Sequence, residues 1–228
     1  MAKTIFERAL EFVKDGDVVG LGSGRASTAF TRLLGERVRA GMRVRGVPTS
    51  EATAHLAREL HIPFGTLEAD MPLALTVDGA DEVSPTLDLI KGYGRALVRE
   101  KIVAASSRLR IILVGKDKLV EKLGQRGNLP VEVIPLAVPL CRERLRKLGV
   151  SPVLWGEGGR PLRTDNGNCI LDCAVSPPGL ADPAAFEAAT RAVPGVVGTG
   201  LFLGMADVVL VGDPDDNFRL LEEKRRGA

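Results

Sequence analysis

The chain has 228 residues, a length that suits one large domain or two small ones. Hydrophobic residues make up 45% and charged residues 26%, which excludes a disordered chain, and a net charge of +2 with 4% aromatic residues does not indicate a nucleic-acid-binding surface. No apolar run approaches the roughly 18 residues of a membrane span, and three cysteines without a Cys-x-x-Cys pair favour neither disulfides nor a structural zinc site.

The first part of the chain predicts alternating helices and strands. Apolar residues at helical spacing predict helices over residues 4–14, 27–40, 50–60 and 95–107. Short apolar runs predict strands over residues 18–22, 44–47, 73–77 and 111–114. The repeated order of strand, turn and helix is typical of a parallel α/β sheet with right-handed crossovers.

The pattern changes near Pro130. Strand-like and helix-like segments then follow in the order β-α-β-β-α-β, which is the split βαβ pattern of a ferredoxin-like unit, over residues 131–134, 138–147, 152–155, 168–175, 183–191 and 196–202. Residues 206–211 predict one more strand, which we assign to the first sheet. We therefore predict a Rossmann-like parallel-sheet domain, residues 1–129 plus 204–228. A smaller ferredoxin-like α+β domain, residues 130–203, is inserted into it near the C-terminus.

A glycine-rich turn, Gly20-Leu21-Gly22-Ser23-Gly24, lies between the first predicted strand and a helix. Backbone N–H groups in such a turn favour a phosphate or another anion. A dinucleotide fingerprint fails, because its third glycine would fall at Arg25 and no acidic residue ends the second strand. Whether the turn binds an anion or needs glycine only for its backbone stays open.

After the next strand, Thr49, Ser50 and Thr53 indicate a helix cap more simply than a ligand site.

Three carboxylates crowd the turn Asp78-Gly79-Ala80-Asp81-Glu82, which follows the third predicted strand. Like charges this close repel each other, so a purely structural turn has little reason to collect them. The turn could hold sugar hydroxyls and move protons, bind a divalent metal ion, or serve as an Asp-rich cap.

Glu100 and Lys91 are further candidates for chemistry. The neighbours of Glu100 three and four residues away along its helix are all apolar, so its carboxylate is expected to be desolvated, which suits a general base. Pairing of Glu100 with a distant cation is the alternative. Lys91 precedes glycines and could offset the charge of a developing oxyanion. Lys116 and Lys118 follow the fourth strand and could meet a phosphate.

Together these segments resemble ribose-5-phosphate isomerase type A over nearly the whole chain. The shared motifs, in order, are Gly-x-Gly-Ser-Gly, Thr-Ser-x-x-Thr, Asp-Gly-Ala-Asp-Glu, Lys-Gly-x-Gly followed by Glu-Lys-Ile, a lysine after the next strand, and Leu-Pro-Val-Glu-Val. The specific part is the 78–82 turn followed by Lys91 and the sequence Arg99-Glu100-Lys101.

The resemblance implies interconversion of ribose 5-phosphate and ribulose 5-phosphate in the non-oxidative pentose phosphate pathway. The reaction runs through a cis-enediolate, without a metal or another cofactor. Glu100 is implied as the base between C2 and C1, Lys91 as the oxyanion stabiliser, and Asp81 as the group that helps to open the sugar ring. The implied substrate-binding residues, with 23–26 on the phosphate side, are Ser23, Gly24, Arg25, Ala26, Asp78, Gly79, Ala80, Asp81, Lys91, Gly92, Tyr93, Gly94 and Lys118.

Two places depart from the family's usual pattern. Arg25 and Ala26 stand where the family usually has Ser-Thr, so either a charged fork at Arg25 or the hydroxyls of Ser27 and Thr28 would serve the phosphate. Tyr93 stands where the family commonly has glycine, and it would be strained if the backbone needs a positive φ there.

Two other functions remain open from the residues. Related α/β folds also serve as sugar-phosphate-sensing domains that bind without turnover. An amino-sugar phosphate deaminase is the third candidate. From the resemblance we expect a homo-oligomer, a dimer or tetramer. We expect a sugar phosphate as ligand, no nucleic-acid or membrane partner, and a cytoplasmic location, since the charged start of the chain does not look like a secretory signal.

Overall fold

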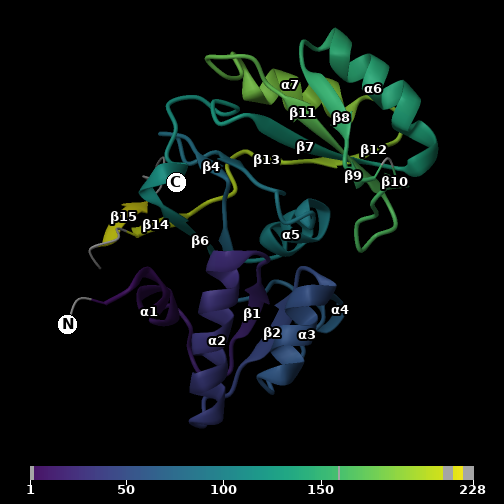
Figure 1. Ribbon diagram of the computed structural model, residues 1–228. Coiled ribbons are helices and arrows are strands. Elements are labelled where there is room, and N and C mark those ends of the chain that lie inside the picture. The colour runs from purple at the N-terminus through teal and green to yellow at the C-terminus, as the bar shows by residue number, and fades with distance from the viewer. Residues whose placement is uncertain (1–2, 159, 213–217, 223–228) are drawn as a thin grey trace. The chain divides into compact units, whose positions relative to one another are not determined.

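The computed structural model describes residues 3–158, 160–212 and 218–222 (Figure 1). The chain forms two compact units, and each is assembled from separate stretches of sequence. The first unit comprises Met1–Ala80, Arg99–Lys118 and Met205–Ala228, and the second comprises Asp81–Val98 and Leu119–Gly204. Relative to the boundaries predicted above, residues 81–98, residues 119–129 and Gly204 group here with the second unit.

The first unit is built on a six-stranded sheet with the order β15-β14-β6-β3-β1-β2. All neighbouring strands are parallel except β14 and β15, which are antiparallel. Counted along the chain, the five parallel strands have the order 2-1-3-4-5, in which the winding direction reverses between β1 and β3. The strands are β1 (Val18–Leu21), β2 (Arg45–Pro48), β3 (Leu75–Gly79), β6 (Arg110–Gly115), β14 (Val208–Gly212) and β15 (Phe218–Glu222).

Helices lie on both faces of this sheet. A core of residues from α1, α2 and alternate positions of β1, β3 and β6 covers one face. On the other face, α5 packs so closely that a Cβ at Gly20 would lie 2.5 Å from Val103. The helices associated with this unit are α1 (Ile5–Leu10), α2 (Arg25–Arg39), α3 (Glu51–Glu59), α4 (Leu67–Asp70), α5 (Leu97–Ala105) and the 3-10 turn η1 (Lys116–Lys118). Two covered faces explain why the strands are continuous apolar runs.

The second unit contains a four-stranded antiparallel sheet with the order β12-β7-β11-β8. The α6 and α7 helices cover one face of it, and their apolar residues join those of β7 and β11 in a single core (Figure 1). The elements are β7 (Asn128–Val133), η2 (Pro135–Ala137), α6 (Val138–Lys147), β8 (Ser151–Leu154), β11 (Cys169–Ala174), α7 (Pro183–Arg191) and β12 (Val196–Thr199). This arrangement confirms the predicted ferredoxin-like order.

Two small sheets complete the second unit. One is the hairpin of β9 (Gly156–Glu157) and β10 (Arg160–Pro161). The other has the order β13-β5-β4 and joins β4 (Glu82–Val83), β5 (Leu89–Ile90) and β13 (Leu201–Phe202). The single strand predicted over 196–202 is therefore divided at Gly200. A Cβ there would lie 2.3 Å from the Lys91 carbonyl oxygen, so the chain can turn toward β5 only with glycine.

The helix predicted over residues 95–107 begins later, at Leu97. Arg95 has a φ of 65°, which is a left-handed conformation that cannot start a right-handed helix. The predicted return of residues 206–211 to the first sheet is confirmed, because β14 pairs in parallel with β6.

Candidate active site

The carboxyl ends of β1, β2 and β3 carry the first group of candidate residues. The order of the sheet reverses between β1 and β3, and open α/β sheets bind ligands at such a point. The turn after β1 presses directly on the end of β3, since a Cβ at Gly22 would lie 2.1 Å from Oδ1 of Asp78. Only glycine at position 22 leaves this carboxylate where it is.

Asp78 is held firmly at the end of β3, with 4% of the residue exposed. Its Oδ1 atom accepts hydrogen bonds from the Ser23 N–H at 3.2 Å, the Ser27 hydroxyl at 2.9 Å and its neighbouring Gly79 N–H at 2.8 Å. Three donors on one oxygen fix the orientation of the carboxylate. Ser27 was predicted only as a substitute phosphate ligand, and the structure gives it a contact with Asp78 instead.

Four hydroxyl groups extend this network to α3. Ser23 donates to Ser50 at 2.8 Å, Ser50 donates to Thr53 at 3.0 Å, and Thr53 donates to the Gly22 carbonyl at 3.0 Å. The Thr49 hydroxyl lies 2.8 Å from that of Ser23. The predicted cap is confirmed, because Ser50 accepts from the Thr53 N–H. The same hydroxyls also fix Ser23, which sequence reasoning did not anticipate.

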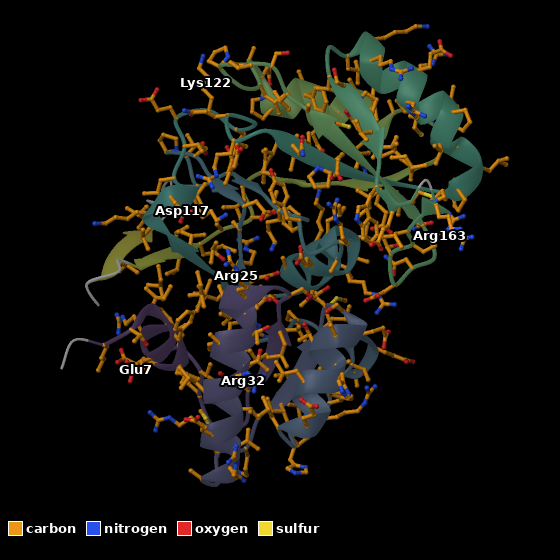
Figure 2. The ribbon with its side chains drawn as sticks, in the orientation of Figure 1. Glu7, Arg25, Arg32, Asp117, Lys122 and Arg163 are labelled. Carbon is orange, nitrogen blue, oxygen red and sulfur yellow. The ribbon has the colours of Figure 1, made fainter. Side chains whose placement is uncertain are left out.

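The α2 helix begins directly after the turn. Gly24, at a φ of 94°, is its N-cap, and among the described residues no side chain caps this helix end. Arg25 is the first helical residue and is exposed at the end of α2 (Figure 2). Ala26 lies near Gly79, where an added Cβ would be 3.7 Å from the alanine Cβ. Lys118 closes η1 after β6, with its Nζ 3.8 Å from the Asp117 carboxylate.

The carboxylates of the 78–82 turn have separate roles in the structure. The Asp81 carboxylate accepts from the Tyr93 N–H at 3.1 Å. Glu82 is fully buried in the second unit and accepts from the N–H groups of Gly124 and Arg126 at 2.6 and 2.7 Å. Glu82 therefore anchors the 124–126 segment, and these backbone donors compensate its charge.

The loop from Lys91 to Arg95, here called the 91–95 loop, lies in the second unit. Lys91 is 4% exposed, its N–H donates to the Gly200 carbonyl at 2.8 Å, and its ammonium lies 5.4 Å from the centre of the Phe202 ring. A buried ammonium over an aromatic face is a fixed positive charge. Gly92, at a φ of 110°, needs the conformational freedom of glycine.

Tyr93 is not strained, because the left-handed non-glycine position of this loop is Arg95. The Tyr93 hydroxyl accepts a hydrogen bond from the Asn128 N–H at 3.2 Å. Burial raises the pKa of Tyr93, and the negative charges of Asp81, Glu82 and Asp172 add to this, although the Asn128 hydrogen bond acts against it. The phenol therefore stays neutral under physiological conditions.

Glu100 is 4% exposed on α5. Its neighbours three and four residues away, Ala96, Leu97, Val103 and Ala104, are all buried, so the predicted apolar stripe is present. A carboxylate in this setting is largely withdrawn from water, which suits transfer of a proton to or from carbon.

No set of three or more His, Cys, Asp or Glu side chains within residues 3–158, 160–212 and 218–222 gathers in a way that could hold a metal ion. In the same residues no helix is both long and apolar enough to cross a membrane.

Sequence reasoning missed Arg95, because nothing in the pattern of the 91–95 loop marks an arginine as left-handed.

Comparison with known proteins agrees with this arrangement. Residues 45–216 match the family described as Ribose 5-phosphate isomerase A (phosphoriboisomerase A). Ribose-5-phosphate isomerase A of Roseiflexus castenholzii is 50% identical over 212 residues, which cover 92% of this chain and 90% of the relative.

Two solved structures have the same fold over almost their whole length. Ribose 5-phosphate isomerase A from Methanocaldococcus jannaschii superposes with a TM-score of 0.90 at 38% identity, covering 96% of each chain. A D-ribose-5-phosphate isomerase in complex with phospho-erythronic acid superposes with a TM-score of 0.89 at 39% identity, covering 95% of each chain.

The first unit has a doubly wound sheet, with a glycine turn and a buried carboxylate at the point where the strand order reverses. The same chain also carries a ferredoxin-like unit. Together these features are typical of an α/β enzyme that acts on a small molecule. The sequence identity of 50% to one relative, over 92% of this chain, narrows this class of enzyme to one family. The chain belongs to the ribose 5-phosphate isomerase A family.

Proposed function

We propose that this protein interconverts D-ribose 5-phosphate and D-ribulose 5-phosphate, as a step of the non-oxidative pentose phosphate pathway. Membership of the family supports the reaction. The observation that carries the residue-level proposal is the buried Glu100 carboxylate on the apolar stripe of α5. Such a carboxylate is a stronger base once substrate has displaced the remaining water.

In the proposed reaction Asp81 helps to open the sugar ring. Glu100 then takes the proton from C2 of the open aldose, and the electron pair of that C–H bond forms the C1=C2 bond of the cis-enediolate while the C1 carbonyl pair moves to O1. The proton of the C2 hydroxyl passes to O1, and Glu100 returns its proton to C1 as the C2 carbonyl forms. Lys91 offsets the negative charge that develops on the enediolate oxygen. Asp78, whose orientation is fixed by Ser23, Ser27 and Gly79, holds substrate hydroxyls.

The phosphate is proposed to bind at the end of α2, on residues 23–26, with Lys118 as a further substrate-binding residue. An uncapped helix N-terminus offers backbone N–H groups to an anion, and Arg25 adds a planar fork of donors. Phospho-erythronic acid, the ligand of one similar structure, supports a sugar phosphate as the substrate. It carries a phosphate at one end and, at the other, a planar anionic carboxylate that resembles an enediolate.

The first experiment measures turnover of ribose 5-phosphate in EDTA by the wild type and by Glu100→Gln. We expect an active wild type and a kcat lower by about 10²–10⁴ in the variant, the usual contribution of a general base. Glu132→Gln is the matched control. Glu132 is also fully buried, and its Oε1 accepts from Thr164 and Asn168, an interaction that glutamine preserves.

Each outcome of this experiment decides between functions. Near-normal kcat in Glu100→Gln would remove Glu100 as the base. Activity that disappears in EDTA and returns with a divalent ion would make Asp78 and Asp81 metal ligands. A folded wild type that binds the sugar phosphate without turning it over would be a sensor, and ammonia release from glucosamine 6-phosphate would identify a deaminase.

Arg25→Ala tests the phosphate site. We expect KM to rise about tenfold or more with little change in kcat, because a contact made equally to substrate and transition state affects binding alone. Arg32→Ala is the control, since Arg32 is exposed on the same helix about 10 Å further along its axis (Figure 2). An unchanged KM in Arg25→Ala would assign the phosphate to the backbone or to Thr28.

We also propose that the protein is a cytoplasmic homo-oligomer, either a dimer or a tetramer. Exposed apolar side chains around the start of α6 support self-association, with Leu136 89% exposed beside Ile134 and Leu140. Light scattering of Leu136→Glu beside the wild type tests this surface. A wild-type monomer would refute the assembly, and an unchanged oligomer in the variant would place the interface elsewhere.

A further inference from the structure

Arg95 has a backbone conformation that its residue type disfavours. Its φ is 65°, and its N–H donates to the Gly92 carbonyl at 2.9 Å, which closes a tight turn at the end of the 91–95 loop. A side chain at such a φ crowds its own backbone, so glycine normally occupies these positions. A strained residue persists only where its surroundings hold it in place.

The guanidinium group of Arg95 is held on two sides. Its Nη1 donates to Oδ1 of Asp172 at 2.6 Å, and its Cζ lies 4.9 Å from the centre of the Trp155 ring. The side chains of Arg95 and Asp172 are only 25% and 18% exposed, so solvent screens this pair less than a surface pair. Lysine could not supply both the directed fork and the flat stacking face.

Both partners of Arg95 belong to rigid structure. Asp172 lies in β11, which is paired on one side with β7 and on the other with β8. Trp155 follows β8 and is tied to β11 by its own N–H, which donates to the Ile170 carbonyl at 2.9 Å. We call the contacts of Arg95 with Asp172 and Trp155 the clamp. The clamp fastens one end of the 91–95 loop to the four-stranded sheet.

The other end of the loop is fastened through its backbone. The Lys91 N–H donates to Gly200, and the Tyr93 N–H donates to Asp81. Gly92 lies between Lys91 and Tyr93, Gly94 lies between Tyr93 and Arg95, and both glycines restrict the backbone little. Fixing the backbone on both sides of two glycines removes much of the freedom that they bring.

We propose that Arg95, held between Asp172 and Trp155, is a positioning residue that sets the conformation of the 91–95 loop before substrate binds. This inference rests on the proposed role of Lys91, because the loop carries that ammonium. An ammonium group that is already positioned for the enediolate stabilises the transition state more than it stabilises bound substrate. Loss of the clamp therefore lowers kcat more than it raises KM.

Arg95→Gly is the decisive variant, because it separates positioning from stability. Glycine relieves the left-handed strain while it removes the ion pair, so the melting temperature stays close to that of the wild type. We expect kcat to fall about tenfold with KM changed less than about twofold. Arg95→Ala retains the strain, so it loses the same activity and also melts at a lower temperature.

Asp172→Asn tests the other side of the clamp. It should lower kcat to a similar extent, and the double variant Arg95→Gly/Asp172→Asn should be no worse than Arg95→Gly alone. The control is Asp207→Asn, which breaks an ion pair with Arg110 in the first unit whose side chains are 25% and 26% exposed. It should lower the melting temperature and leave kcat unchanged.

A structural readout keeps this proposal separate from the reaction itself. Trp155 is the only tryptophan of the chain, so its fluorescence reports the Arg95 contact directly. In Arg95→Gly, the Trp155 emission should shift to longer wavelength, and hydrogen exchange at the Lys91 and Tyr93 amides should rise at least tenfold.

A wild type without isomerase activity would refute the proposed function, and fluorescence and exchange would still decide the role of Arg95. Unchanged exchange in Arg95→Gly would overturn the positioning proposal. In an active wild type, full kcat in Arg95→Gly or Asp172→Asn would also overturn it.

Discussion

The turn at Gly22–Gly24 and the 91–95 loop both combine glycines with residues proposed to contact substrate, but different forces hold them. The turn is fixed by close packing against Asp78 and by a chain of short hydroxyl side chains that ends on the backbone. The 91–95 loop is fixed by backbone hydrogen bonds at Lys91 and Tyr93 and, at Arg95, by a long side chain with an ion pair, a ring contact and a strained backbone position.

This difference predicts how each segment responds to change. Repulsion between atoms rises steeply at short distance, so a side-chain atom added in the turn either fits or disrupts it. An ion pair that is partly exposed weakens gradually with substitution or salt. The turn should therefore tolerate almost no substitution, while the loop should show graded losses.

Gly22→Ala should have the largest effect. The new Cβ would lie 2.1 Å from Oδ1 of Asp78, so the carboxylate or the turn must move. We expect a loss of about 1–3 kcal/mol in the free energy of unfolding and of at least about 10² in kcat/KM, measured by denaturation and steady-state kinetics. Gly16→Ala is the control, since Gly16 has a φ of 90° but no atom within 4 Å of an added Cβ. Comparable kinetics in both variants would show that the Asp78 contact is unimportant.

Ser27→Ala should have an intermediate effect. It removes the 2.9 Å hydrogen bond to Asp78 from a fully buried position, which should cost about 1–2 kcal/mol of stability. The freed carboxylate should hold substrate hydroxyls less well, so we expect KM to rise about tenfold. Ser107→Ala is the matched control, because it removes a buried 2.7 Å hydrogen bond to the Val103 carbonyl. It should lose stability with normal kinetics, and a normal KM in Ser27→Ala would limit that serine to folding.

Tyr93→Phe should have the smallest effect, and it should depend on pH. Burial raises the pKa of Tyr93 above its ordinary value of 10.0. The folded protein thus holds the phenolic proton more tightly than the unfolded chain does. This stabilisation is complete below the unfolded pKa and is lost as the pH rises through the folded pKa.

Denaturation of wild type and Tyr93→Phe at rising alkaline pH measures this contribution. The wild type should lose stability more steeply than the variant above the ordinary tyrosine pKa. Tyr93 is the only tyrosine of the chain, so ultraviolet titration reads its ionisation directly. Parallel stability curves for the two proteins would contradict the upward shift of the pKa.

Much of the fold follows from local patterns in the sequence. The bounds of α6 and α7 coincide with the predicted helices, because each has apolar residues at helical spacing and a proline in its first turn. The two-residue strand β4 escaped prediction and β13 was not separated from β12, since a period of two residues cannot be recognised in so short a run. The strand β13 pairs with β5, which lies more than one hundred residues earlier in the chain.

The candidate site shows a similar limit. The sequence indicates that Asp78, Asp81 and Glu82 are unusual as a group, but it cannot assign each carboxylate to its donors. Glu82 differs from the other two carboxylates because it accepts hydrogen bonds from backbone N–H groups more than forty residues away along the chain. Arg95 was missed for a related reason, because its partners Trp155 and Asp172 come together with it only in the folded sheet.

The sheet of the first unit is completed late during synthesis on the ribosome. β6 pairs on one side with β3 and on the other with β14, and residues 119–204 of the second unit are made between β6 and β14. A nascent chain therefore presents the open edge of β6 while the ferredoxin-like unit is being translated. An unpaired, apolar parallel edge is a template for wrong pairing. Slow elongation through residues 119–204 should thus increase the demand for chaperones.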